Sequence, residues 1–520
     1  MVPSRCLIMH WTSMSSTTLV VNAILFLVAV VVVRKLHSRR LHNSLGLPYP
    51  PGPIPSVIPF VSNIHDMPIK EEWFKFTEWG KQYGPLVMLE VMGQKMCIIN
   101  TIRAATDLLD ARSAIYSDRP QMRMVRELMG WEFNVGFQSY GAKHKKSRKL
   151  FHHGFNPRAS DAYQPIQTRE ITLLLEKLLR CPERFEELLR ETTGSIIMMI
   201  AFGYQTVKND EFVRIAEEAQ FAMVSAARPG AYFVDFIPFL KYVPEWVPGA
   251  HFQCVAREGR ELAEELQTKP YAWARRQFDE GKAKPSFFRS IMEAKGLCSD
   301  DPLEEEQLIR KATALMYATG ADTILASVLN FFLAMLHAPE ELSRVVGNHR
   351  LPAFADRASL PYIECIVKET LRWEQGAVLV SFDMIVNDDR CYNYSHPAWH
   401  DSHDESMYPD PMTFRPERFM DAPAAKDGGP CDPNTIAFGW GRRICPGRFL
   451  AENSLWLHVA TTLACFSISP IIGSDGKPVI LPRDYTSGLA SRPKSFSCHV
   501  LPRNPEAVEL VRECVASVES

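Results

Sequence analysis

The 520-residue sequence lacks several signals that would assign it to a common functional class. Its formal net charge is only −2, which gives no reason to expect nucleic acid as a partner. None of its twelve cysteines forms a C-x-x-C pair, so zinc-site and thioredoxin-like spacings are absent. Scattered cysteines of this kind favour reduced thiols in a reducing compartment. No Gly/Ser linker, low-complexity tract or repeat divides the interior, which favours one large folded body.

The N-terminus contains a conspicuous apolar run, "LVVNAILFLVAVVVV", over residues 19–33. With the two threonines before it, the run is just long enough to cross a bilayer. Basic residues follow the run instead of preceding it, which favours a membrane anchor over a cleaved signal peptide. We therefore expect a single-pass anchor at residues 1–36, a basic and proline-rich hinge at 37–58, and a folded domain at 59–520 on the cytosolic side.

Helical periodicity dominates beyond residue 70, and it predicts helices over 168–180, 210–227 and about 304–337. Short β-type runs occur at 86–100 and 378–385, so the sequence predicts a mainly α protein with a small β-rich part. One stretch, "PGAYFVDFIPFLKYVPEWVPG" (229–249), is too rich in aromatics for an ordinary exposed loop. A loop that packs on the core and a second membrane contact both remain open for it.

A loop with the sequence "FGWGRRICPGRF" carries the most specific chemical signal. Cys445 precedes a helical pattern there, and the N–H groups at a helix start stabilise a thiolate. A cysteine nucleophile would need a nearby base, and a zinc site would need further ligands, none of which the loop contains. A thiolate that is the sole protein ligand of a haem iron needs only one cysteine. The spacing F-x-x-G-x-R-x-C-x-G is met at Phe438, Gly441, Arg443, Cys445 and Gly447.

This loop resembles the haem-binding signature of the cytochrome P450 family. The resemblance covers nearly the whole chain and is strongest to fungal microsomal members, in particular the group similar to O-methylsterigmatocystin oxidoreductase. It implies the cytochrome P450 fold, a large helical domain with a small β-rich subdomain, behind the transmembrane helix. It also implies haem b as the cofactor, with Cys445 as the axial ligand and Arg443 binding a haem carboxylate.

Two further motifs match the family. For "TGADTI", the resemblance implies that Gly320 opens the helix beside the haem and that Asp322 and Thr323 help deliver protons during the cleavage of dioxygen. In "KETLRW", the resemblance implies a buried charged network of Glu369 and Arg372 with Arg418 or, as the weaker candidate, Arg415.

The sequence departs from the family pattern at three places. Where Trp is usual in W-x-x-x-R, the chain has His144, although Arg148 is kept for a haem carboxylate. A proline is missing after the "KETLRW" helix, and the following strand pair looks shortened between Ser395 and Ala398. A second shortening is expected near 336–347.

The resemblance implies a haem-thiolate monooxygenase of the endoplasmic-reticulum membrane. It would insert one oxygen atom into a hydrophobic small molecule, in fungal secondary metabolism or xenobiotic oxidation. Electrons would come from NADPH–cytochrome P450 reductase, with cytochrome b5 as a possible second donor. The candidates for lining the substrate pocket are residues 122–137, 221–236 and 375–382. An inactive haem-binding relic and a reductase-independent isomerase or dehydratase are the alternatives.

Overall fold

The computed structural model describes residues 47–56, 62–68, 70–228, 230–294, 296–337, 350–376, 379–387, 390–420, 430–479, 483–486 and 491–519. The fold described below belongs to the compact unit Gly52–Ser520. The expected anchor at 1–36 and nearly all of the expected shortening at 336–347 lie outside the described residues.

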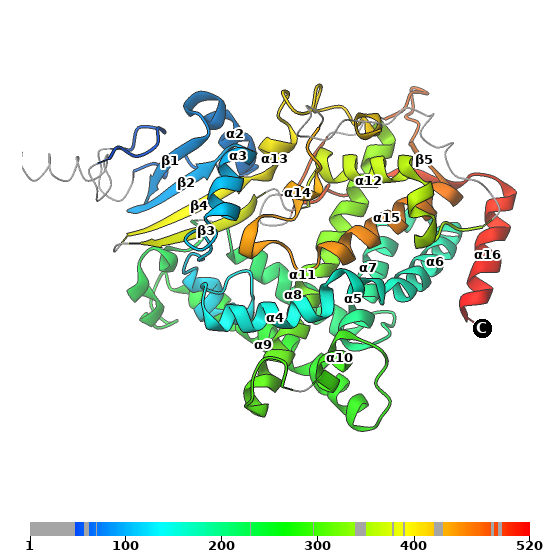
Figure 1. Ribbon diagram of the computed structural model, residues 1–520, viewed down its shortest axis with the longest axis horizontal. Helices are drawn as coiled ribbons and strands as arrows, with labels where there is room; N and C mark the ends of the chain where they lie inside the picture. Colours follow the sequence, from blue (N-terminus) through cyan, green and yellow to red (C-terminus); the bar gives the residue numbers. More distant parts are fainter. Residues whose placement is uncertain are drawn as a thin grey trace, which may run out of the picture. The chain divides into compact units, whose positions relative to one another are not determined.

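The main sheet has the strand order β1-β2-β4-β3 and joins two distant parts of the chain (Figure 1). Strands β1 (Leu86–Val91) and β2 (Gln94–Ile99) form an antiparallel hairpin. Strand β4 (Arg390–Pro397) pairs parallel to β2 and antiparallel to β3 (Leu379–Asn387). The late strand pair, which looked shortened in the sequence, therefore still completes the sheet, and α13 (Ala398–Ser402) follows β4 directly.

Helix α2 (Glu72–Tyr83) covers this sheet with a largely aromatic face. Trp73, Phe76 and Trp79 recur at helical spacing and are each at most 3% exposed. A second, two-stranded sheet consists of β5 (Phe466–Pro470) and β6 (Cys498–Pro502). Both predicted regions of β structure are present, and the expectation of a mainly helical protein with a small β-rich part is confirmed.

The helices enclose one large hydrophobic core around α11 (Pro302–His337) (Figure 1). Helix α11 is apolar on most of its faces, as expected for a helix surrounded by others. Against it pack α7 (Phe185–Phe202), α9 (His251–Asp279) and α15 (Arg448–Cys465). The remaining long helices are α4 (Ala142–Phe155), α6 (Gln164–Arg180), α8 (Glu211–Ala226), α10 (Phe287–Ala294), α12 (Pro361–Trp373) and α16 (Pro505–Glu519).

The three helices predicted from periodicity are confirmed as α6, α8 and α11. The start of α8 shows a local cause: the Asp210 carboxylate accepts hydrogen bonds from the N–H groups of Phe212 and Val213, at 2.8 and 3.3 Å. Among the described residues, only Pro302–Leu336 is long and apolar enough to cross a membrane, and it is largely buried in the protein core.

The aromatic stretch between α8 and α9 forms short turns, including η5 (Phe233–Asp235) and η6 (Pro238–Tyr242). Four of its aromatic side chains are exposed: Phe233 by 62%, Phe239 by 66%, Tyr242 by 77% and Trp246 by 82%. A loop that buries its aromatics in the core is therefore the wrong interpretation for these four residues.

Candidate haem site

Cys445 lies between the turn η11 (Gly441–Arg443) and the start of α15. Its backbone N–H donates to the Phe438 carbonyl oxygen at 2.8 Å, which closes the loop around the thiol. Gly447 is the residue before α15, and a Cβ there would lie 4.0 Å from Cys445 Sγ. The loop thus presents its sulfur at a helix start, as the sequence suggested.

Burial raises the pKa of the Cys445 thiol, while the Gly447 N–H, Arg148 and Arg448 act in the opposite direction. The protein groups alone therefore do not produce the stabilised thiolate that the helix start suggested, because the desolvation penalty is larger than their effect. A metal cation bound at the sulfur would reverse this balance, since a coordinating thiol is deprotonated.

Gly441 holds the loop in place by a close backbone contact. Its φ is +53°, and a Cβ at this position would lie 2.0 Å from the Leu109 carbonyl oxygen. The Gly441 N–H also donates to the carboxylate of Asp110, in the turn η1 (Thr106–Ala111). Only glycine allows this approach, so the motif glycine has a specific packing role.

A group of cationic side chains surrounds His144 near the loop. Arg443 donates to the carbonyl oxygens of Ser117, Val135 and Gln138, at 2.7, 3.1 and 2.8 Å. Arg148 donates to the Ile444 carbonyl oxygen at 2.8 Å, directly beside Cys445. The structure therefore brings together Arg443 and Arg148, which the sequence placed far apart.

His144 itself is 2% exposed, and its Nδ1 has no hydrogen-bond partner among the described residues. Burial, helped by Arg443, Arg148 and Arg119, lowers the pKa of His144 to about 3. A neutral imidazole with an unpartnered ring nitrogen beside three guanidinium groups suits an anionic ligand. This orphaned atom and the arginines around it fit the carboxylates of haem.

Arg442, which had no role in the sequence, contacts Tyr140 at the start of α4. Its guanidinium donates to the Tyr140 hydroxyl and lies 5.3 Å from the ring centroid. Sequence reasoning missed this contact because Tyr140 and Arg442 lie about 300 residues apart in the chain.

The central turn of α11 carries the "TGADTI" residues. Thr319 is exposed, although Ala318 and Ala321 on either side are buried. The Thr323 hydroxyl donates to the Thr319 carbonyl oxygen at 2.9 Å. Asp322 and Thr323, to which the sequence assigned proton transfer, are partly buried in the same turn.

Asp322 forms ion pairs that the sequence did not indicate. Its Oδ1 lies 3.5 Å from Nη1 of Arg190 on α7. It also lies 3.8 Å from Nη1 of Arg492, in the segment that precedes β6. No local pattern could have revealed either partner, since each comes from a different part of the chain.

Glu369 and Arg372 form a fully buried bidentate ion pair on α12, with N···O distances of 2.7 and 2.8 Å. The Arg418 side chain joins this pair at 3.1 Å from each Glu369 oxygen. Arg415 contacts Glu369 only through its backbone N–H, at 2.8 Å. Of the two arginines considered from the sequence, Arg418 is thus the one whose charge enters the network.

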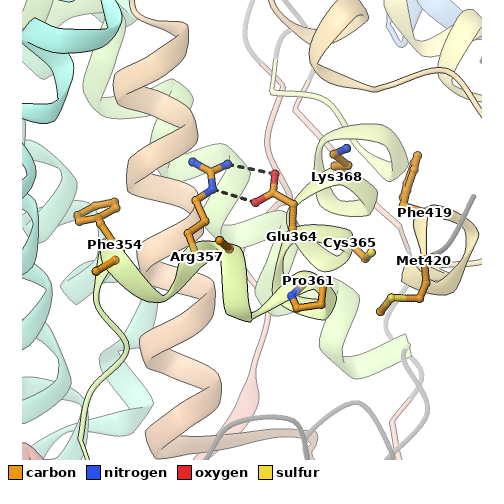
Figure 2. Close-up of a pocket in the computed structure, with 10 residues that line it drawn as sticks. Phe354, Arg357, Pro361, Glu364, Cys365, Lys368, Phe419 and Met420 are labelled. Atoms are coloured by element: carbon orange, nitrogen blue, oxygen red, sulfur yellow. Dashed lines mark hydrogen bonds and ion pairs between the residues drawn. The ribbon is translucent and has the colours of Figure 1, made fainter. Parts of the chain in front are cut away.

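A surface pocket of about 630 Å³ is lined by residues of η8 (Phe354–Ser359) and α12 and by Phe419 and Met420 (Figure 2). Arg357 and Glu364 face each other in it, at N···O distances of 2.9 and 3.0 Å. Lys368 at its margin pairs with Asp432 at 3.0 Å. None of the predicted site residues lines this pocket.

The arrangement of the Cys445 loop, the cationic group and the α11 turn defines a haem-thiolate protein. The family model described as Cytochrome P450 matches residues 50–500, and the chain belongs to this family. Two of its relatives are Cytochrome P450 monooxygenase COX2 of Coprinopsis cinerea and Cytochrome P450 monooxygenase 208 of Postia placenta. The first is 35% identical over 91% of this chain and 93% of its own length, and the second 37% identical over 89% and 92%.

A third relative, Tryptamine 4-monooxygenase of Psilocybe cyanescens, is 33% identical over 94% of this chain and 99% of its own length. Among solved structures, a zebrafish cytochrome P450 crystallised with progesterone covers 83% of this chain and 99% of its own length. Its TM-score is 0.66 at 20% identity, which supports the fold alone.

These findings confirm the cytochrome P450 fold, the monooxygenase class and haem as the cofactor. They do not favour the relic or the isomerase alternative, because the relatives are named as monooxygenases. The narrower resemblance to the O-methylsterigmatocystin oxidoreductase group stays a prediction.

Proposed function

We propose that this cytochrome P450 monooxygenase binds haem through Cys445 and oxidises a hydrophobic small molecule at the membrane surface. The observation that carries the proposal is the loop of Cys445 beside Arg443, Arg148 and the unpartnered His144 Nδ1. Bound haem supplies the oxidation chemistry, and its thiolate ligand favours cleavage of the O–O bond.

The cationic side chains orient the cofactor in this proposal. The charges of Arg443 and Arg148 would attract the haem carboxylates, and neutral His144 adds one N–H donor. Gly441 and Gly447 keep side chains away from the loop, and Phe438 anchors it through its carbonyl.

Asp322 and Thr323 hold and move protons on the substrate side of α11. The Thr323 hydroxyl can donate outward once its bond to the Thr319 carbonyl is given up. Asp322 is 30% exposed, so it can exchange protons with solvent and pass them toward the threonine.

The substrate is an apolar or aromatic small molecule. The stretches 122–137, 221–236 and 375–382 are the candidates for its pocket. A relative named for oxidation of tryptamine supports a role in secondary metabolism, although the substrate of this chain is not thereby defined.

The proposed location is the endoplasmic-reticulum membrane. Residues 1–36 would form the single membrane anchor, and the folded domain would lie in the cytosol. Electrons come from NADPH–cytochrome P450 reductase on the same membrane, with cytochrome b5 as an additional donor. The four exposed aromatics between Phe233 and Trp246 support a second contact with the lipid interface.

The test of the cofactor assignment is the carbon-monoxide difference spectrum of the reduced, membrane-bound protein. We expect the red-shifted thiolate band in the native chain, its loss in Cys445→Ser, and its retention in Cys431→Ser, which changes a half-buried cysteine. A thiolate band in Cys445→Ser would overturn the assignment. If the band forms, but reductase and NADPH give no product from a panel of terpenoid, polyketide, steroid and indole substrates, the relic alternative is favoured.

A further inference from the structure

Four charged side chains from four parts of the fold meet beside the proposed proton relay. Asp322 comes from α11, Glu217 from α8, Arg190 from α7 and Arg492 from the C-terminal segment. Arg190 Nη1 lies 3.5 Å from Asp322 Oδ1 and 4.0 Å from Glu217 Oε1. Arg492 Nη1 lies 3.8 Å from Asp322 Oδ1. Two carboxylates are thus held by two guanidinium groups.

Arg492 is itself held by the backbone around it. Arg492 donates its N–H to the Thr486 hydroxyl at 3.1 Å, and its carbonyl accepts from the Thr486 N–H at 2.9 Å. The preceding residue, Ser491, donates its N–H to the Gly376 carbonyl at 3.0 Å. A Cβ at Gly376 would lie 3.4 Å from the Thr323 carbonyl oxygen. The segment that carries Arg492 is therefore packed against the same turn of α11 as the relay.

The Arg492 Nη1 atom is buried and has no hydrogen-bond partner among the described residues. The Asp322 carboxylate lies 3.8 Å from it. A buried guanidinium nitrogen that makes no hydrogen bond is costly, so its charge interaction with Asp322 is the compensation that the structure offers. The C-terminal segment is also tied to α7, because Glu186 accepts from the Ser495 hydroxyl and the Phe496 N–H at 2.9 and 2.7 Å.

We propose that Arg190 and Arg492 are positioning residues for the relay carboxylate of Asp322, and that Glu217 on α8 shares them. The inference rests on the proposed relay function of Asp322. A carboxylate that is ion-paired on two sides is held in one orientation, whereas an unpaired carboxylate can rotate toward solvent. Because Glu217 contacts Arg190, the position of α8 also changes how firmly Asp322 is held.

The test uses the full-length haem-loaded enzyme with reductase and NADPH. The measured quantity is coupling, the moles of product formed per mole of NADPH, together with the solvent isotope effect on product formation. Arg190→Gln and Arg492→Gln should each lower coupling by about three- to tenfold, since they remove partly exposed ion pairs from a proton-transfer group. Arg190→Lys and Arg492→Lys should recover most of the loss, because the charge is kept.

Three comparisons make the result specific. Glu217→Gln should leave coupling unchanged or raise it, because both arginines then serve Asp322 alone. Arg214→Gln, which removes an exposed arginine paired with Glu218 on α8, should have no effect. The melting temperature and the carbon-monoxide spectrum should be the same in all variants, which separates positioning from loss of structure.

Two outcomes would overturn the inference in different ways. If Asp322→Asn loses coupling but the arginine variants keep it, the relay role of Asp322 is supported and the positioning role of the two arginines is contradicted. If Asp322→Asn itself keeps full coupling, the relay falls and the positioning role falls with it.

Discussion

Arg418 Nε lies 3.1 Å from each of the two carboxylate oxygens of Glu369, which Arg372 already holds in a bidentate pair. All three side chains are buried: Glu369 and Arg372 completely, and the Arg418 side chain to within 4%. The carboxylate thus receives two guanidinium groups and the Arg415 backbone N–H at once. Removal of one member leaves the others charged in the interior.

Arg418→Ala should lower the free energy of unfolding by about 1.5–3 kcal/mol, the range for a lost hydrogen bond to a charged group, because Glu369 stays paired with Arg372. Arg415→Ala is the matched control, because the Arg415 side chain is exposed and its contact with Glu369 is made by the backbone. Urea unfolding followed by tryptophan fluorescence measures both. Equal destabilisation by the two substitutions would contradict a role for the Arg418 charge.

Gly441→Ala should displace the cysteine loop, because the new Cβ would lie 2.0 Å from the Leu109 carbonyl oxygen at a φ of +53°. We expect a large loss of haem per mole of purified protein. Gly476→Ala is the control: its φ is +73° with open space around the Cβ, so only the backbone cost of about 1–2 kcal/mol applies. Equal haem content in the two variants would show that the close contact is unimportant.

Gln375→Leu should raise the free energy of unfolding by about 1–3 kcal/mol. Gln375 is 3% exposed, and neither atom of its amide has a hydrogen-bond partner among the described residues. An apolar side chain of similar size removes two unsatisfied groups. Thermal denaturation of the two proteins measures the change.

The control for Gln375 is the buried Gln167, whose amide nitrogen is satisfied although its amide oxygen has no hydrogen-bond partner among the described residues. Gln167 Nε2 donates to the Ser454 hydroxyl at 2.6 Å and the Leu450 carbonyl at 3.2 Å. Gln167→Leu should therefore destabilise the protein. A stabilising effect of both substitutions, or of neither, would show that hydrogen bonding does not distinguish the two sites.

His458 should make stability fall as the pH drops from about 6.5 to about 4. Burial lowers its pKa to about 4 from the ordinary 6.5, although its contact with the Ser454 carbonyl opposes the shift. Between these values the unfolded chain takes up a proton that the folded protein refuses, so acid favours unfolding. The full effect is about 3 kcal/mol for a shift of this size.

His458→Asn should flatten this acid dependence, because an amide can keep a hydrogen bond to the Ser454 carbonyl but does not titrate. The slope of the unfolding free energy against pH is compared with that of His499→Asn, which changes an exposed histidine on β6. An unchanged slope in His458→Asn would assign the acid sensitivity to other groups.

The features that could be predicted from the sequence are those whose cause lies within a few turns of chain. Periodic apolar residues indicated α6, α8 and α11, because a helix must bury one stripe or more of its surface. The twelve-residue cysteine loop was recognisable for the same reason: ligand, glycines and helix start follow one another directly.

Contacts across the fold could not be predicted in this way. Arg190 and Arg492 meet Asp322 only because α7 and the C-terminal segment pack on α11, and His144 lies among arginines from three segments. The resemblance already favoured Arg418 over Arg415 for the buried network, but the contact distances to Glu369 come only from the structure.

The sequence by itself determined the class of the protein and pointed to Cys445 as the proposed haem ligand, since a contiguous motif carries both signals. Only the tertiary structure decided which arginines pair with Asp322, that four aromatic side chains of residues 229–249 are exposed, and why a Cβ at position 441 would clash with the Leu109 carbonyl oxygen. Those properties depend on distances between segments that are remote in sequence. Tertiary packing sets those distances, and no local sequence pattern encodes it.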